Sequence, residues 1–405
     1  MHLLKTPMKA LSSRARNLAS LSLKTALIPL LVCAYAAAKP KLPVLAFYAE
    51  WDQPGSVDYS KITHLLLAFS LPQGGGGVTG YVPGGVVGSA HAAGVKVLAS
   101  VGGANHGSIF PGIAGNAGSR TTFANSLKSI CDANGLDGVD IDWEYPLNAT
   151  DSANFTLLLK AVRSAMGSKL ISIDLAADGE KGAFINKAAL TIPDFVNIMS
   201  YDFTGSFAGS VVGQHSPYTK ATANLNYWRA KGVPKERLIL GVPFYGKDFN
   251  QGGAPVAYSQ IMGSNPGISN DADSVGRCWF NGVTTIKKKA TYVAQMEYGG
   301  VMIWELAQDA GGAKSLLAAL NTGLEAIPLS ISPDNGRVRA VSGASAAGNL
   351  GVSGKVWLTL SGARSAEGVG AHLSHPLVRD VLGHAHGASR AVGSGAYFLN
   401  AEAGR

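Results

Sequence analysis

The sequence is poor in cysteine and in charge. Three cysteines in 405 residues are too few for the disulfide framework of a small secreted scaffold. Charged residues make up 15% of the chain and hydrophobic residues 46%, which excludes a disordered protein because disorder needs low hydrophobicity and high net charge. The 51 glycines follow no triplet period, which excludes collagen. No apolar run after residue 38 has the length of a transmembrane helix.

The net charge of +8 is concentrated at the two ends of the chain. Residues 1–38 carry five Lys/Arg and no acid, and residues 326–405 carry seven Lys/Arg and four acids. The body, residues 39–325, therefore holds 22 residues of each sign and is neutral. A neutral body gives no indication of a nucleic-acid groove, and we expect no nucleic-acid partner.

The first 38 residues have the pattern of an export signal. A basic stretch precedes a short apolar segment, Thr25–Ala34, and the small residues Ala36–Ala38 precede Lys39. We expect cleavage there and a secreted protein without stable membrane insertion, or a periplasmic one in a bacterium. An uncleaved anchor at the membrane interface is the alternative.

Residues 326–405 form a separate segment rich in Gly, Ala, Ser and Arg. Four histidines, His372, His375, His384 and His386, suggest a metal site, but no Cys or carboxylate lies beside them at ligand spacing. Scattered histidines in a loose tail are the favoured interpretation. The sequence leaves open a small appended domain, a flexible tail or the product of a shifted reading frame.

The body alternates apolar runs of strand length with helix-like stretches. Continuous apolar runs are typical of parallel strands buried on both faces. Eight such strands with crossovers predict an α/β fold, a (β/α)8 TIM barrel over 39–325. The expected strands are Val44–Tyr48, Ile62–Phe69, Val95–Val101, Leu136–Trp143, Leu170–Ala176, Phe195–Tyr201, Leu238–Phe244 and Gly300–Leu306, and expected helices include Arg120–Asn134, Asn154–Met166, Lys220–Lys231 and Thr284–Gln295.

A doubly wound open sheet is the alternative fold. It usually places a glycine-rich phosphate loop after the first strand, and Ala49-Glu-Trp-Asp52 is not such a loop. The glycine-rich stretch Gln73–Val78 follows the second strand and opens no helix, so we interpret it as a flexible loop.

The fourth expected strand carries a ladder of acids. Because side chains alternate faces along a strand, Asp140, Asp142 and Glu144 share one face at steps of about 6.6 Å. Their neighbours Val139, Ile141 and Trp143 would pack beneath the helices. Three like charges inside a barrel cannot all stay ionised at low cost, so we expect at least one raised pKa, as a general acid needs.

A solvated acidic edge and a metal site are the alternatives to an acid–base role for this ladder. The solvated edge is disfavoured because the alternating positions are apolar. A Mg²⁺ or Ca²⁺ site is disfavoured because the remaining strand ends add no obvious ligands. We therefore predict neither a metal nor a cofactor.

The motif Asp137-x-x-Asp140-x-Asp142-x-Glu144, followed by Tyr-Pro, resembles the signature of glycoside hydrolase family 18, the chitinase family. The resemblance extends over about residues 43–320. Further matching segments are Ser100-Val-Gly-Gly103, Met199-Ser-Tyr201-Asp202, Val242-Pro-Phe-Tyr-Gly246 and Met302-Ile-Trp304-Glu305.

The resemblance implies a chitinase that retains anomeric configuration by substrate-assisted catalysis. Glu144 would be the general acid, Asp142 would orient the substrate acetamido group and Asp140 would support Asp142. Tyr201 would bond the acetamido oxygen. The predicted substrate contacts are Asp202, Trp304, Met199, Ser100, Tyr245 and Tyr48, and Trp51 and Phe203 are further candidates for the cleft.

Two departures from the family pattern affect these expectations. Phe47 stands where the family often has Tyr, so we expect Ser100 to be the main neutral partner of Asp140. Only residues 246–283 fill the interval in which many members insert a larger domain, which predicts a shallow, open groove.

The expected partner is chitin or N-acetylglucosamine oligosaccharides, bound by a monomer. The alternatives are an endo-β-N-acetylglucosaminidase acting on N-glycans and a non-hydrolysing chitin-binding lectin, although such lectins usually lose the acid at the position of Glu144. Cys131 and Cys278 fall toward opposite ends of the predicted barrel, so we expect no disulfide.

Overall fold

The computed structural model describes residues 42–326 and, beyond them, three short antiparallel strand pairs. The predicted signal peptide and most of the predicted tail lie outside the described residues. The chain divides into two units, Met1–Val341 and Ser342–Arg405. The first unit also holds the pair β14 (Leu329–Ile331) and β15 (Val338–Ala340), and the second holds β16 (Val378–Arg379) with β17 (Ala385–His386) and β18 (Ser389–Arg390) with β19 (Tyr397–Phe398).

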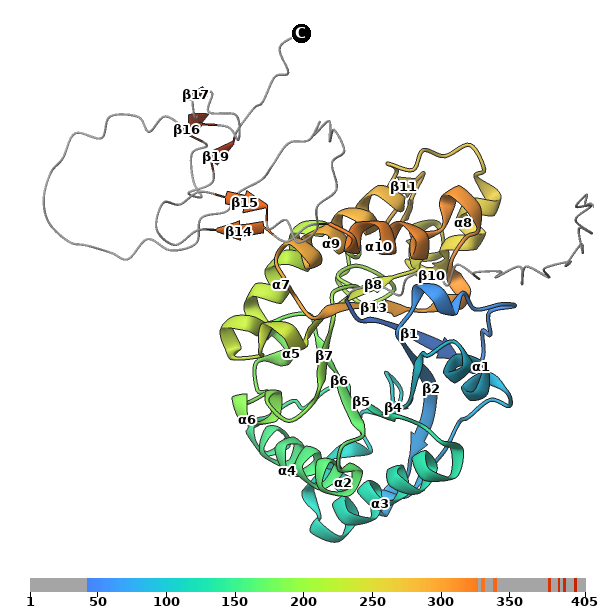
Figure 1. The fold of residues 1–405 in the computed structure, drawn as a ribbon, viewed down its shortest axis with the longest axis vertical. Helices are drawn as coiled ribbons and strands as arrows, with labels where there is room; N and C mark the ends of the chain where they lie inside the picture. The colour runs from blue at the N-terminus through green and yellow to red at the C-terminus, as the bar shows by residue number, and fades with distance from the viewer. Residues whose placement is uncertain are drawn as a thin grey trace, which may run out of the picture. The chain divides into compact units, whose positions relative to one another are not determined.

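Eight parallel strands of the first unit close into a barrel, which confirms the predicted fold (Figure 1). Each strand pairs with the next one along the chain, and the last strand pairs with the first. The barrel strands are β1 (Val44–Ala49), β2 (His64–Pro72), β4 (Lys96–Gly102), β5 (Gly138–Asp142), β6 (Leu170–Ala176), β7 (Phe195–Met199), β8 (Leu238–Pro243) and β13 (Gly300–Trp304).

The helices lie outside the ring of strands (Figure 1). The helices begin and end at residues that favour such positions. The side chains of Asn116 and Asn148 accept backbone N–H bonds at the starts of α3 and α4, and Gly135 ends α3 with a left-handed φ of 66°. Among the described residues no helix is long and apolar enough to cross a bilayer. The helices are α1 (Val86–Ala92), α2 (Phe110–Gly115), α3 (Ala117–Asn134), α4 (Ala149–Met166), α5 (Gly179–Gly182), α6 (Lys187–Leu190), α7 (Tyr218–Lys231), α8 (Tyr258–Ser264), α9 (Val283–Gln295) and α10 (Leu316–Leu324).

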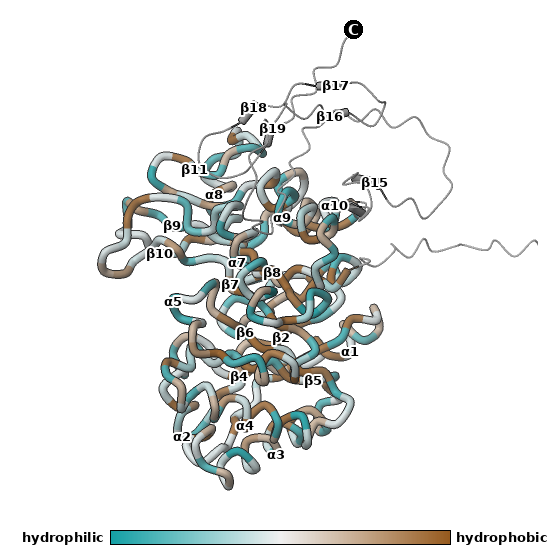
Figure 2. The backbone as a smooth tube through the Cα atoms, turned by 90° about the vertical axis from the view of Figure 1, so that its left-hand side faces the viewer, coloured by the Kyte–Doolittle hydropathy of each residue, from teal (hydrophilic) through white to brown (hydrophobic). Residues whose placement is uncertain are grey.

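The apolar core has two parts, one on each side of the barrel wall. The larger part lies between strands and helices, and the strands are the most hydrophobic stretches of the tube in Figure 2. The smaller part fills the barrel interior with Leu45, Phe47, Leu66, Ala68, Ile239 and Met302. The interior cluster draws on β1, β2, β8 and β13, with Phe195 and Met199 of β7 packed against it. Buried polar side chains enter the interior from β4, β5, β6 and β7: Ser100, Asp140, Asp142, Ser172, Asp174 and Asn197.

The stretch Gln73–Val78 is more ordered than the flexible loop that the sequence suggested. Gly74–Gly76 form a 3-10 turn, and β3 (Val78–Thr79) pairs back on β2. Gly76 has a φ of 98°, and a Cβ there would lie 2.1 Å from the carbonyl oxygen of Ser119. The glycines therefore allow close packing of this turn against α3.

The segment between β8 and α9 folds as a small module of its own. It contains α8 and a four-stranded antiparallel sheet of order β10-β9-β12-β11. Its strands are β9 (Tyr245–Asp248), β10 (Ala254–Ala257), β11 (Ser274–Val275) and β12 (Cys278–Trp279). The interval treated as a short connection in the sequence thus holds a compact α+β insertion, and β9 carries two residues of the cleft.

Cys131 and Cys278 are both free thiols. Cys131 is buried near the end of α3, with its sulfur 3.3 Å from the carbonyl oxygen of Gly138. Burial raises the pKa of Cys131 to about 12 and that of Cys278 to about 11. Neither thiol is therefore a nucleophile near neutral pH.

Candidate active site

A cleft of about 930 Å³ opens at the carboxyl ends of the barrel strands. This is the end at which TIM barrels carry their chemistry. Seven of the ten predicted site residues line it: Asp142, Glu144, Met199, Tyr201, Asp202, Tyr245 and Trp304. The structure therefore brings these seven residues together at one cleft, and further polar residues of its lining, such as Asp174, Lys181 and Lys247, were not among those predicted.

The acid ladder on β5 has the predicted alternation. Asp140 and Asp142 are buried in the barrel interior, and Glu144 follows the strand at the mouth of the cleft. Trp143 points the other way, where it stacks on Phe110 of α2 at 5.4 Å and meets Phe155 of α4 edge-on at 5.5 Å. The apolar face thus locks β5 against the helices while the acids face inward.

The ends of β5 are fixed by two other motif positions. Gly102, at the end of β4, has a φ of 121°, and a Cβ there would lie 2.1 Å from the backbone oxygen of Asp142. At the opposite end, the carboxylate of Asp137 accepts bonds from Lys96 and the backbone N–H of Val97 at 2.8 and 2.9 Å. Asp137, the first acid of the motif, therefore anchors the strand outside the cleft.

Asp140 is fully buried among neutral donors. Ser100 and Ser172 donate their hydroxyls to its two carboxylate oxygens at 2.7 and 2.5 Å, and the Asn197 amide donates at 3.4 Å. Burial raises the pKa of Asp140, and the hydrogen bonds offset part of that rise. Ser100 is a neutral partner of Asp140, as predicted, but Ser172 and Asn197 donate to the same carboxylate.

Asp142 lies above Asp140, is 3% exposed and has an unpartnered atom. Its Oδ1 has no hydrogen-bond donor among the described residues. Burial, followed by the negative charges of Glu144 and Asp140, raises the pKa of Asp142 well above its usual range. A buried acceptor without a donor is costly, so this oxygen is prepared for a donor from a ligand.

Glu144 is partly buried at the mouth. Burial raises its pKa, and the nearby Tyr145 and the charge of Lys181 offset part of the rise. Glu144 combines access to the cleft with a carboxyl group that holds its proton to a higher pH than a free glutamate. All three acids of the ladder have raised pKa values, and the sequence predicted this for at least one of them.

Asp174 is a fourth interior acid that the sequence analysis missed. It lies on β6, is 1% exposed and contributes to the cleft lining. The signal was present in the sequence, because Ser172 and Asp174 alternate with Ile171, Ile173 and Leu175. Two polar residues at a two-residue step in an apolar strand indicate a polar interior face.

The floor of the cleft is aromatic. Trp304, at the end of β13, lies 4.9 Å from Phe47 and 5.7 Å from Phe69, measured between ring centroids. Trp51 extends this cluster outward, 6.2 Å from Trp304, and is 62% exposed. Phe47 thus packs beneath Trp304, and the cluster presents a flat apolar surface of the kind that suits one face of a sugar ring.

Tyr201 also lines the cleft. The hydroxyl of Tyr201 meets only the sulfur of Met302, at 3.9 Å, among the contacts that the structure records. Sulfur is a weak acceptor, so the hydroxyl remains available to a ligand. Met199, the last residue of β7, also lines the cleft.

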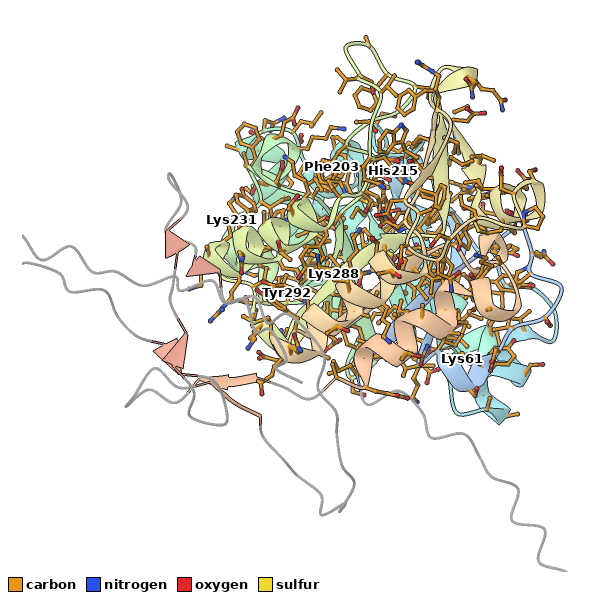
Figure 3. All side chains as sticks on the ribbon, turned by 90° about the horizontal axis from the view of Figure 1, so that it is seen from above. Lys61, Phe203, His215, Lys231, Lys288 and Tyr292 are labelled. Carbon is orange, nitrogen blue, oxygen red and sulfur yellow. The ribbon has the colours of Figure 1, made fainter. Side chains whose placement is uncertain are left out.

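Asp202 belongs to a charged cluster at the rim. Its Oδ1 accepts the Tyr245 hydroxyl at 2.7 Å and pairs with Lys247 at 2.8 Å and with His215 at 3.5 Å. Figure 3 shows Phe203 and His215 close together, and the Phe203 N–H donates to the His215 carbonyl at 3.0 Å. Burial alone would raise the pKa of Asp202, but His215, Lys247 and Tyr245 hold it far below its usual value.

Three predicted site residues lie away from the cleft lining. Asp140 and Ser100 are fully buried beneath it. Tyr48 is 6% exposed and packs between strands and helices, with its hydroxyl 3.4 Å from Gln53. Because side chains alternate along β1, Phe47 faces the barrel interior in its place, and the geometry gives no support for Tyr48 as a substrate contact.

The chemistry of the site lies in its acids and aromatic rings. Within residues 42–326, no group of three or more His, Cys, Asp or Glu side chains has an arrangement that could hold a metal ion. The site can donate a proton at Glu144, accept a hydrogen bond at Asp142 and stack a ring on Trp304.

A closed (β/α)8 barrel with stacked acids and an aromatic floor at its carboxyl end defines a barrel of the glycoside hydrolase type. The chain belongs to the glycosyl hydrolases family 18, whose family model matches residues 44–309.

Known proteins that resemble the chain include chitinases. It is 30% identical over 273 residues to a probable endochitinase of Caenorhabditis elegans, covering 52% of this chain and 43% of that protein. It is 29% identical over 279 residues to chitinase 1 of Aphanocladium album, covering 57% and 66%. The solved family 18 chitinase from the chitin utilization locus of Flavobacterium johnsoniae is 29% identical with a TM-score of 0.62, covering 71% of this chain and 94% of that structure. The chain therefore spans less than two thirds of the length of these two curated relatives.

Proposed function

We propose that the protein is a chitinase that hydrolyses β-1,4 linkages between N-acetylglucosamine residues and retains the anomeric configuration. The observation that carries this proposal is the unpartnered Oδ1 of Asp142, buried between Asp140 and Glu144 and beside the cleft. The site thus holds one proton donor at its mouth and one acceptor that awaits a donor. A 2-acetamido sugar supplies such a donor in its N–H group.

Glu144 donates its proton to the glycosidic oxygen as the bond to the leaving sugar breaks. The acetamido carbonyl oxygen of the substrate attacks the anomeric carbon and forms a cyclic oxazolinium ion. Glu144, now a carboxylate, takes a proton from water, and the resulting hydroxide opens the ring from the face that the leaving group occupied. Two inversions at the same carbon give retention.

Asp142 receives the acetamido N–H at Oδ1 and stabilises the positive charge of the cyclic ion. A donor at this oxygen favours the anionic form of Asp142, against the burial that raises its pKa. Tyr201 donates its hydroxyl to the acetamido oxygen, and Trp304 supports the apolar face of the same sugar. Asp202 contacts this sugar from the rim.

Met199 and Tyr245 complete the contacts of the reacting sugar, since both line the cleft. Asp140 and Ser100 act beneath it as supports of Asp142. We further propose that residues 1–38 direct export and are removed, which N-terminal sequencing of the secreted protein would test, and that the protein works as a monomer.

Product analysis on defined N-acetylglucosamine oligomers tests the proposal. We expect mass spectrometry to show shorter oligomers and proton NMR at early times to show the β-anomer. A thiazoline mimic of the cyclic ion should inhibit strongly, because it resembles the species that the site stabilises. Early appearance of the α-anomer would contradict the mechanism.

The same assay separates the competing functions. A parallel reaction with a high-mannose glycopeptide should show no cleavage. Cleavage of the glycopeptide alone would identify an endo-β-N-acetylglucosaminidase. Binding of chitin oligomers without turnover would identify a lectin.

A further inference from the structure

The carboxyl group of Asp174 has no role in the mechanism above. It is 1% exposed, lies on β6 next to the acid ladder of β5, and borders the cleft. Neither of its oxygens has a hydrogen bond of good geometry among the described residues, although Asp140 and the Asn197 amide lie close enough to shift its pKa. An ionised carboxylate buried without such a bond would be among the most costly groups in the protein.

Asp140 has the opposite environment. It accepts from three neutral donors, the hydroxyls of Ser100 and Ser172 and the amide of Asn197. The side chain of Asp174 also comes within hydrogen-bonding reach of Asp140, and the contact lowers the pKa of Asp140 and raises that of Asp174. Two carboxyl groups can share a hydrogen bond only if one of them carries a proton.

The donors decide which carboxyl group holds the proton. Hydrogen bonds from neutral groups favour the charged form of the acceptor, so Asp140 is the anion. Asp174 has the Asn197 amide of β7 as its one neutral donor, which lowers its pKa only in part. It also faces Asp140 and Asp142 on β5 and Tyr201 after β7. Burial and the charges of Asp140 and Asp142 raise the pKa of Asp174 well above its usual range, and no cation among the described residues opposes them.

We propose that Asp174 is a positioning residue that stays protonated and donates its O–H to Asp140. This inference deepens the proposed function and rests on it for its consequence. Asp140 is then an anion whose hydrogen-bonding capacity is filled. Asp142 therefore does not share a proton with Asp140, and its Oδ1 is available to the substrate. Asp174 therefore acts on the reaction through Asp140 and Asp142, without touching the sugar.

Two variants of similar size separate the hydrogen bond from simple packing. Asp174→Asn keeps a donor toward Asp140 and stays neutral, whereas Asp174→Leu fills the space without a donor. We expect Asn to retain kcat within about threefold and Leu to lose about 10- to 100-fold, the effect of one unsatisfied buried group. Equal turnover of the Leu variant and the wild type would overturn the proposal.

The pH profile gives a readout that packing alone would not change. If Asp174 is neutral in the wild type, Asp174→Asn removes no charge, and the alkaline limb of kcat/KM should stay in place. If Asp174 is ionised, its replacement removes a negative charge near Glu144 and moves that limb to lower pH. Such a movement overturns the proposal.

A direct measurement on the wild type needs neither a variant nor turnover. Neutron diffraction from deuterated crystals near pH 7 should place a deuteron on Asp174, directed at Asp140. A deuteron on Asp140, or none between the two, overturns the inference. This result does not depend on hydrolysis. Failure to cleave chitin would contradict the proposed function, whereas the neutron result alone tests the protonation of Asp174.

Discussion

Two groups of acids share one cleft and have opposite electrostatic environments. Asp140, Asp142 and Asp174 lie in the barrel interior among hydroxyls and an amide, and their pKa values are raised by burial. Asp202 lies half exposed at the rim beside His215 and Lys247, and its pKa is strongly lowered. Depth and partner change together here: the interior acids are buried without a paired cation, whereas the rim acid is half exposed and paired with a lysine.

The comparison assigns different work to the two groups. Interior acids without cations can hold and pass protons near neutral pH, which is what bond cleavage needs. A rim acid fixed as an anion by a lysine can only accept hydrogen bonds and hold a position. Variants that change one group should therefore alter the chemical step, whereas variants that change the other should mainly alter binding and local stability.

The largest effect is expected from Glu144→Gln. The amide cannot donate a proton to the leaving oxygen, so kcat should fall by about 10²- to 10⁴-fold while oligosaccharide binding is retained. In the wild type, activity should decline as pH rises through the raised pKa of Glu144, because the acid form is then lost. Steady-state kinetics and calorimetric binding measure both.

Glu236→Gln is the matched control for that variant. Glu236 lies in a 3-10 turn, Lys235–Arg237, directly before β8, so it sits at the end of the barrel opposite the cleft. Its replacement should leave kcat unchanged. Near-normal turnover of Glu144→Gln would break the distinction between the acid ladder of β5 and its end, which transfers the proton, and the fixed acid at the rim.

A smaller effect is expected from two tyrosines, Tyr201 beside the interior acids and Tyr245 bonded to Asp202 at the rim. Tyr201→Phe removes a hydroxyl that meets only a sulfur at 3.9 Å and is free for the substrate, and it should lower kcat about 10- to 100-fold. Tyr245→Phe removes one donor to Asp202 but leaves Lys247 as its partner. We therefore expect kcat/KM to fall less than about fivefold, mostly through a higher KM. A larger loss for Tyr245→Phe would reverse the assignment.

The interior group was more predictable from sequence than the rim group. Asp140, Asp142 and Glu144 follow one another at the two-residue period of a strand, so alternation alone places them on one face. The same rule applied to β6 would have found Ser172 and Asp174. It also shows that Phe47 and Tyr48 cannot both face the interior.

The rim cluster could not be predicted in this way. Asp202, His215 and Lys247 come from two loop positions and the small inserted sheet, and no period connects them. Asp202 also has a φ of 62°, a left-handed conformation that depends on its surroundings. Contacts between segments that lie far apart in the sequence require the folded geometry.

The smallest expected effect comes from Lys247→Met, which keeps the length of the side chain and removes its charge. A carboxyl group with a lowered folded pKa adds stability above its unfolded pKa of about 3.9, and this stability is lost as pH falls toward the folded pKa. Because Asp202 is half exposed, with 51% of its side chain accessible, the loss at pH 7 should stay below about 1 kcal/mol. Urea unfolding measures it without added salt.

The pH dependence decides whether charge is the cause. The stability difference between Lys247→Met and the wild type should be largest near neutral pH and shrink as the acidity rises below about pH 4. Lys235→Met, which breaks the exposed pair with Glu297 at 3.4 Å, provides the surface control. An equal loss of unfolding free energy at both ends of the pH range would contradict this prediction. It would mean that Lys247 stabilises the rim by packing of its aliphatic chain and not by its ion pair with Asp202.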